Sequence, residues 1–149
     1  MTRPRRNTRP RDALGRPLPY GSVGVDGPAE GIVRSAAESL REAQRLLDAG
    51  RPFHAHEVLE DAWKTGPERE RELWRGLAQL AVGITHAARG NATGATRLIE
   101  RAAANVGAHR TAAPPELRVD ELLGWCRAAV ETIGRGVPVD LDPPRLVST

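Results

Sequence analysis

A segment near the middle of the chain, FHAHEVLEDAW (residues 53–63), combines histidine and carboxylate side chains at helical spacing. At about 100° per residue, one arc of a helix would hold Phe53, His56, Leu59, Glu60 and Trp63. We expect this arc to be the packing face, where an ionisable carboxylate is costly unless a hydrogen bond or an opposite charge compensates it. His56 and Glu60 should therefore meet polar groups of a neighbouring helix, whereas His54 points off the arc and should be exposed.

The partners are expected in the next helix, within GLAQLAVGITHAA (residues 76–88). Gln79 and His86 are seven residues apart and so lie on one stripe of that helix. Gly76 and Gly83 have no side chains and would let another helix come close. The spacing therefore predicts that the two helices pack with the imidazole, carboxylate and amide groups converging, in a cluster formed by His56, Glu60, Trp63, Gln79 and His86.

Two kinds of chemistry fit such a cluster. In a metal site, His56, Glu60 and His86 would be ligands for zinc, iron or manganese, and Glu57 would be the general base of a metal-dependent hydrolase. The spacing is HExxE, whereas zinc peptidases use HExxH. In a structural network, Glu60 would accept a hydrogen bond from an imidazole or from an indole N–H, and Gln79 would bridge. The network is the more ordinary arrangement, because buried polar groups are normally hydrogen-bonded.

The rest of the composition excludes several classes of protein. Cys126 is the only cysteine, which rules out an intramolecular disulfide framework and a cysteine-based zinc cluster and suits a reducing cytoplasm. We expect it to be a small buried hydrophobe rather than a nucleophile. No apolar run reaches about 18 residues and no secretory signal is recognisable, so a cytoplasmic protein without a membrane span is expected. No segment resembles a strand, which disfavours nucleotide binding by a glycine-rich phosphate loop.

The elements that would position the cluster are all helical. Hydrophobic residues make up 40% of the chain and aromatic residues 3%, a composition that favours closely packed helices. The periodicity predicts an all-α fold, a compact bundle of about five helices in consecutive antiparallel hairpins, with the nearly all-apolar third helix in the middle. The start and stop signals are a capping box at Ser35 to Glu38, a stop at Gly50, a start at Pro52, a helix from about Pro67 to Arg89, a cap at Asn91, and a last helix from Asp120 as a possible cap to Gly134.

The chain divides into three parts by composition. Residues 1–31 are rich in Arg, Pro and Gly and are expected to form a disordered arm, on which Leu14, Leu18 and Tyr20 could be pinned against the body. Residues 32–135 form the helical domain, and residues 136–149 form a C-terminal tail. Six Arg and one Asp give residues 1–16 a net charge of +5, whereas the remaining residues carry 16 basic and 18 acidic side chains. Any contact with nucleic acid is therefore expected only through residues 1–16.

Two motifs, in the order in which they occur in the chain, resemble those of a known family. FHAHEVLEDAWK, followed by WRGLAQLAVGITHAARGNATGATRLI, is similar to a small all-helical bacterial and archaeal family catalogued as domain of unknown function three hundred and nine. The resemblance covers roughly residues 38–105, implies a compact bundle of about five helices, and implies no activity. The family pattern falls on His56, Glu57, Glu60, Trp63, Gly76, Leu77, Gln79, His86, Gly90, Asn91, Gly94 and Ala95.

The sequence predicts a ligand- or partner-binding module in which the His/Glu/Gln cluster organises a groove. The partner would be a small ligand or another protein, and the chain could also form a homo-oligomer. The alternatives are a metal-dependent hydrolase that uses the same cluster and a nucleic-acid-associated protein that acts through the arm. The arrangement of His56, Glu60, Gln79 and His86 in space distinguishes the binding module from the metal-dependent hydrolase.

Overall fold

A computed structural model of the 149-residue chain describes Asp12 and residues 14–16, 33–136 and 141–148. Within these residues the regular structure is entirely helical, which confirms the predicted all-α class. Two short 3₁₀ turns, Glu68–Glu70 and Arg110–Ala112, precede the third and fifth helices. The five helices are α1 (Ala36–Asp48), α2 (Pro52–Thr65), α3 (Arg71–Ala88), α4 (Ala92–Ala108) and α5 (Val119–Gly134).

Helix α1 begins and ends where its sequence predicts. The Ser35 hydroxyl accepts a hydrogen bond from the Glu38 amide at 3.1 Å, and the Glu38 carboxylate accepts one from the Ser35 amide at 3.0 Å. This reciprocal capping box satisfies two amides that have no partner within the helix. After the last turn, Gly50 adopts a φ of 73°, a left-handed conformation that costs glycine little. Pro52 then opens α2 as its first residue.

Two helix starts differ from the sequence prediction. The third helix was expected from about Pro67, but the acidic residues after Pro67 form a 3₁₀ turn and the α-helix begins at Arg71. The fifth helix begins at Val119, and its N-cap, Arg118, makes no capping hydrogen bond through its side chain. Asp120 is therefore not the cap: it lies in the first turn, where its charge suits the helix dipole, and it pairs with Arg110.

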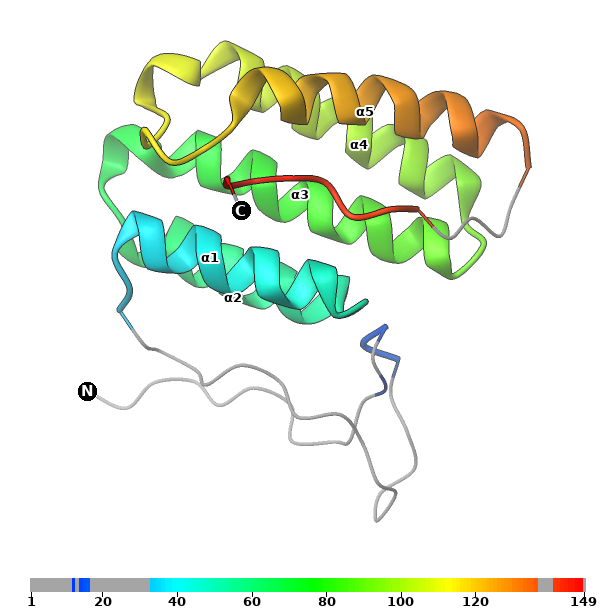
Figure 1. The fold of residues 1–149 in the computed structure, drawn as a ribbon, viewed down its shortest axis with the longest axis horizontal. Coiled ribbons are helices and arrows are strands. Elements are labelled where there is room, and N and C mark those ends of the chain that lie inside the picture. Colours follow the sequence, from blue (N-terminus) through cyan, green and yellow to red (C-terminus); the bar gives the residue numbers. More distant parts are fainter. Residues whose placement is uncertain (1–11, 13, 17–32, 137–140, 149) are drawn as a thin grey trace.

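Helix α3 lies at the centre of the fold (Figure 1). It packs against α2 on one side and α4 on the other, while α1 packs on α2 and α5 packs on α4. Consecutive helices are thus neighbours in space, as the hairpin prediction required. The core side chains of α3 include Leu73, Leu77 and Leu80, each no more than 2% exposed.

Glycines set the distance between α3 and α4. A Cβ atom on Gly76 would lie 2.9 Å from the Asn105 Cβ, and one on Gly83 would lie 2.9 Å from the Ile99 Cγ1 and 3.3 Å from the Ile99 backbone nitrogen. Real Cβ atoms are rarely this close to other atoms. The prediction that these glycines admit a neighbouring helix is correct, and that helix is α4.

The chain ends are partly described. Leu18 and Tyr20, and most of the predicted arm, lie outside the described residues, as do residues 137–140 of the tail. The Leu14 carbonyl accepts a hydrogen bond from Arg89, at the end of α3. Residues 141–148 pack on the helices, and Leu146 is 1% exposed, so this part of the predicted tail contributes to the core.

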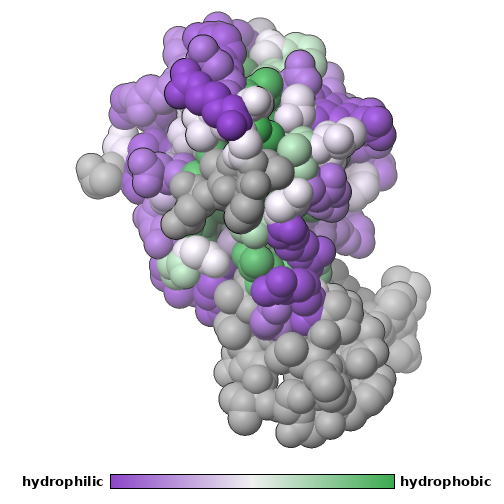
Figure 2. Space-filling model, turned by 90° about the vertical axis from the view of Figure 1, so that its right-hand side faces the viewer, coloured by the Kyte–Doolittle hydropathy of each residue, from purple (hydrophilic) through white to green (hydrophobic). Residues whose placement is uncertain are grey.

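Much of the surface is polar. Figure 2 shows one end of the molecule, where hydrophilic residues dominate and hydrophobic ones appear in small areas between them. Among the described residues, none of the helices is both long enough and apolar enough for a membrane span.

The close contact between α3 and α4 predicts the effect of one methyl group. Gly83→Ala should lower the free energy of unfolding by about 1–3 kcal/mol, because the added Cβ overpacks the contact with Ile99. Gly134→Ala is the matched control, since nothing lies within 4 Å of its added Cβ, and it should change stability by no more than about 0.5 kcal/mol. Urea unfolding measures both. Equal stability of the two variants would contradict the proposed packing.

Candidate functional site on helix α2

A chain of ionic contacts runs along one edge of α2. The His56 Nε2 lies 2.9 Å from one carboxylate oxygen of Glu60, and the Lys64 Nζ lies 2.6 Å from the other. The three residues are four apart and therefore lie on one stripe of the helix. The His56 and Glu60 side chains are 22% and 30% exposed, so they lie at the margin of the packing face and not within it.

The buried polar side chains of α2 are different residues. His54 is 2% exposed and Asp61 is 4% exposed, which makes the prediction of an exposed His54 wrong. The reason is that α2 packs between α1 and α3, so its buried surface is wider than one stripe. The Arg51 Nε donates to the His54 Nδ1 at 3.3 Å, which gives this buried imidazole a polar partner.

An aromatic ring and a backbone turn lie at the start of this edge. The Phe53 ring is 5.6 Å from the His56 ring and 6.0 Å from the His54 ring, centroid to centroid. A Cβ on Gly15 would lie 2.1 Å from the Phe53 ring, and Gly15 has a φ of +76°. Only glycine therefore fits here, both because of the contact and because of the backbone conformation.

Trp63 lies at the other end of the edge, among cations. The guanidinium carbons of Arg71 and Arg75, from the first turns of α3, lie 5.8 and 6.0 Å from the centre of its ring. At these distances the ring quadrupole attracts a cation. The Trp63 Nε1 is buried and has no hydrogen-bond acceptor among the described residues. Of the two kinds of donor predicted for Glu60, it is an imidazole, that of His56, that lies against its carboxylate, and not this indole.

Gln79 and His86 make their hydrogen bonds elsewhere. The Gln79 Oε1 accepts a bond from the Asn105 Nδ2, on α4, at 2.8 Å. The His86 Nδ1 lies 3.2 Å from the Asn91 Nδ2, at the turn before α4. Between described residues, no hydrogen bond joins either side chain to His56 or Glu60. The hydrogen bonds of Gln79 and His86 are thus with α4 and with the turn before it, and the convergence of the four side chains between α2 and α3 stays a prediction.

The surroundings of His86 keep it neutral. Burial, and secondarily the charge of Arg89, lower the pKa of His86 below its usual 6.5. The Asn91 Oδ1 already accepts the Gly94 amide at 3.0 Å as the cap of α4, so the Asn91 Nδ2 faces the imidazole. A neutral His86 can accept that donor at Nδ1, whereas a protonated one would present a second donor.

Metal chemistry gains no support from this geometry. Among the described residues, no group of three or more His, Cys, Asp or Glu side chains could hold a metal ion. His86, one of the three predicted ligands, is bonded at the α3–α4 turn. Glu57, the predicted general base, is partly buried on α2. Cys126 is 3% exposed, and burial raises the pKa of its thiol to about 11, so it is the buried hydrophobe that the sequence predicts.

What the α2 edge offers is partly buried negative charge. We call His56, Glu57 and Glu60 the α2 polar face. Helix α2 carries three carboxylates, those of Glu57, Glu60 and the buried Asp61, and one lysine, Lys64. Asp61 was not predicted as a site residue. Its spacing from His54, Ala55, Val58 and Ala62 could have identified it, because these residues share the buried side of the helix.

The α2 polar face lies within the part of the chain that is similar to a known protein family. Residues 40–98, from α1 into α4, match the family model described as "Domain of unknown function (DUF309)". An uncharacterized protein of Bacillus subtilis (strain 168), YpuF, is 46% identical over 48 residues, which are 32% of this chain and 28% of that protein. An uncharacterized protein of Aquifex aeolicus (strain VF5) is 33% identical over 73 residues, 48% of this chain and 22% of that protein. The chain thus spans less than a third of either relative, and no solved structure matches.

The neutral state of His86 predicts a dependence of stability on pH. Folding lowers the pKa of His86, so the unfolded chain binds this proton at a higher pH than the folded protein does. The stability contributed by the neutral imidazole is therefore complete above pH 6.5 and is lost as the pH falls through the folded pKa. His86→Gln should therefore lose less stability than the unmodified chain between pH 7.5 and pH 5.5. Urea midpoints at the two pH values measure this. An equal loss in both proteins would show that His86 protonation does not oppose folding.

Proposed function

We propose that this chain, whose residues 40–98 form a domain of the DUF309 family, is a partner-binding module and that its α2 polar face binds a basic polypeptide segment. The observation that supports the proposal is that Glu57 and Glu60 lie close together on α2, both partly buried and partly accessible. Partly buried carboxylates attract cations more strongly than exposed ones, because the surrounding protein screens charge less than water does.

The chemistry of the face favours guanidinium groups. A carboxylate can accept two parallel N–H bonds from one arginine, which gives both energy and orientation. The neighbouring Trp63 ring already lies beside two guanidinium groups of its own chain, those of Arg71 and Arg75. Aromatic rings and carboxylates along one edge therefore suit an arginine-containing segment better than an acidic or a purely apolar one.

The charges of the chain also favour a basic partner. Outside residues 1–16 the chain carries 16 basic and 18 acidic side chains, and on α2 the three carboxylates face one lysine. The nucleic-acid alternative depends on residues 1–16, of which the structure describes Asp12 and residues 14–16, and it stays a prediction. The small ligand and the homo-oligomer likewise stay predictions.

Charge-neutral substitution tests the proposal. Glu57→Gln with Glu60→Gln should weaken binding of a fluorescently labelled arginine-rich peptide to the full chain by about tenfold or more, since charge-assisted hydrogen bonds contribute about 1.5–3 kcal/mol each. Fluorescence anisotropy at low and at physiological salt measures the affinity. Loss of the pairs that Glu60 makes with His56 and Lys64 should cost little stability, because both pairs are partly exposed.

The control removes the same charge elsewhere. Glu100→Gln with Glu131→Gln changes two exposed carboxylates on α4 and α5 and should leave the affinity within about twofold, apart from the screened long-range attraction. If both double variants weaken binding equally, the peptide recognises net charge and not the α2 polar face. Absence of binding by the unmodified chain would also refute the proposal.

A further inference from the structure

A second surface of the molecule holds an extended piece of its own chain. Residues Leu141–Ser148, here called the strap, run back along α5 and cross the front of α3 between α1 and α5 (Figure 1). Side chains of α1 and both backbone and side-chain groups of α5 contact the strap. We call these contacting residues, Gln44 and Asp48 on α1 and Arg118 and Trp125 at α5, the seam.

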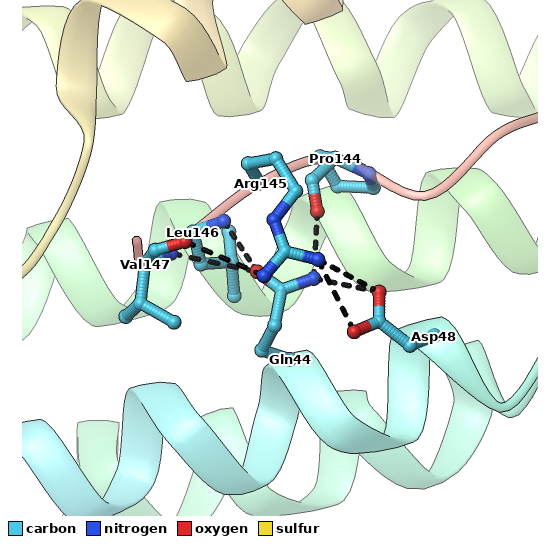
Figure 3. A network of polar contacts seen from close by, with 6 residues as sticks. All are labelled: Gln44, Asp48, Pro144, Arg145, Leu146 and Val147. Carbon is cyan, nitrogen blue, oxygen red and sulfur yellow. Dashed lines mark hydrogen bonds and ion pairs between the residues drawn. The ribbon is translucent and has the colours of Figure 1, made fainter. Parts of the chain in front are cut away.

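The α1 side of the seam recognises the strap backbone through one amide (Figure 3). The Gln44 Nε2 donates to the Pro144 carbonyl at 2.9 Å, and the Gln44 Oε1 accepts the Leu146 amide at 2.6 Å. A side-chain amide offers one donor and one acceptor side by side, as a peptide group of a neighbouring strand does. Gln44 is 4% exposed, so these bonds lie in the interior.

The α5 side recognises the same backbone from the opposite direction. The Arg118 backbone amide donates to the Leu146 carbonyl at 2.9 Å, and the Trp125 Nε1 donates to the Asp142 carbonyl at 2.9 Å. Leu146 therefore has both its backbone N–H and its C=O bonded, one to each helix. Such main-chain bonding is the way in which proteins hold extended peptides.

Side chains of the strap alternate between two environments. Pro144 and Leu146 are buried, and Leu146 belongs to the same core cluster as the leucines of α3. Arg145, between them, points to Asp48, with its Nη1 3.2 and 3.3 Å from the carboxylate oxygens. This period of two is that of an extended strand, with two apolar anchors and one cation between them.

We propose that the seam is a recognition site for an extended peptide with the pattern Pro-Arg-aliphatic, and that the strap occupies it as an intramolecular ligand. Backbone bonds fix the extended conformation, the buried position of Leu146 selects an aliphatic side chain, and Asp48 adds a weak preference for a basic residue. A partner protein that carries such a segment binds the seam by displacing the strap. The site is separate from the α2 polar face and does not depend on the function proposed for it.

Displacement replaces the buried Leu146 and the bonds to its backbone with the same contacts from the partner segment, whereas the remaining strap contacts are weak. The Arg145 and Asp48 side chains are 37% and 43% exposed, so their ion pair contributes little. Asp142, Pro143 and Ser148 are exposed. The strap competes mainly because it is tethered, since a linked segment acts as though it were present at millimolar concentration. A free peptide of the same sequence should therefore bind weakly until the strap is disabled.

A peptide added in trans tests this proposal in the full chain. Leu146→Asn removes the apolar anchor of the strap and leaves the seam intact. A fluorescently labelled peptide with the sequence of residues 141–148, LDPPRLVS, should bind this variant at least about tenfold more tightly than it binds the unmodified chain. Adding Gln44→Leu to Leu146→Asn should abolish the gain. The same peptide with Asn in place of the Leu that corresponds to Leu146 should bind neither protein.

Stability provides the second measurement. If Leu146→Asn loosens the fold, the peptide should raise its melting temperature, because a ligand that binds only the folded state stabilises it. The melting temperature should not rise with the Asn-containing peptide. Failure of LDPPRLVS both to bind and to stabilise Leu146→Asn would overturn the proposal. Equally tight binding to Leu146→Asn with and without Gln44→Leu would overturn it as well, since the peptide would then not occupy the seam.

Discussion

Between Gly76 and Ala88, helix α3 is apolar around most of its circumference, and its apolar residues must be covered by neighbouring elements. Its leucines face the core, its glycines admit α4 at close distance, and α2 packs on the other flank. Burial of apolar surface contributes about 25 cal/mol per Å² to folding, so leaving any flank of α3 open would be costly. The strap follows from the same requirement, because Leu146 completes the core between α1 and α5.

The same constraint determines where polar side chains can lie. Since α2 is packed between two helices, His56 and Glu60 are at the margin of its buried surface, where they remain partly accessible. Gln79 lies on the stripe of α3 that faces α4, and so bonds with Asn105. The polar residues predicted to form one cluster therefore make three separate sets of contacts: His56 with Glu60, Gln79 with Asn105, and His86 with Asn91. The set that keeps carboxylates near solvent is the one on α2, which is why we propose partner binding there.

The sequence predicted the local features well and the direction of side chains less well. The capping box at Ser35, the stop at Gly50 and the cap at Asn91 are local signals, and the structure confirms each of them. The position of His54 depends on how many neighbours α2 has, which its own periodicity does not contain. The partner of Gln79 depends on which helix approaches the glycines of α3, and both α2 and α4 satisfied the pattern.

The role of residues 141–148 could not be read from the sequence for a related reason. Their prolines and short apolar positions are typical of a tail, and only the tertiary structure brings Gln44 and Arg118 to the backbone of Leu146, some 100 and 28 residues away. Hydrogen bonds from side chains to an extended backbone leave no periodic signal. By contrast, the family resemblance was identifiable, because its motifs lie within the matched residues 40–98.

The central proposal is that the polar residues of α2, and not those of α3, receive a basic segment, at a site separate from the seam. Two-dimensional NMR of the full chain during titration with an arginine-rich peptide tests it most directly. The account predicts shifts in the resonances of His56, Glu57, Glu60 and the Trp63 indole, while the side-chain amide of Gln79 and the imidazole of His86 stay in place. Shifts confined to Gln79 and His86, with α2 unaffected, would contradict it.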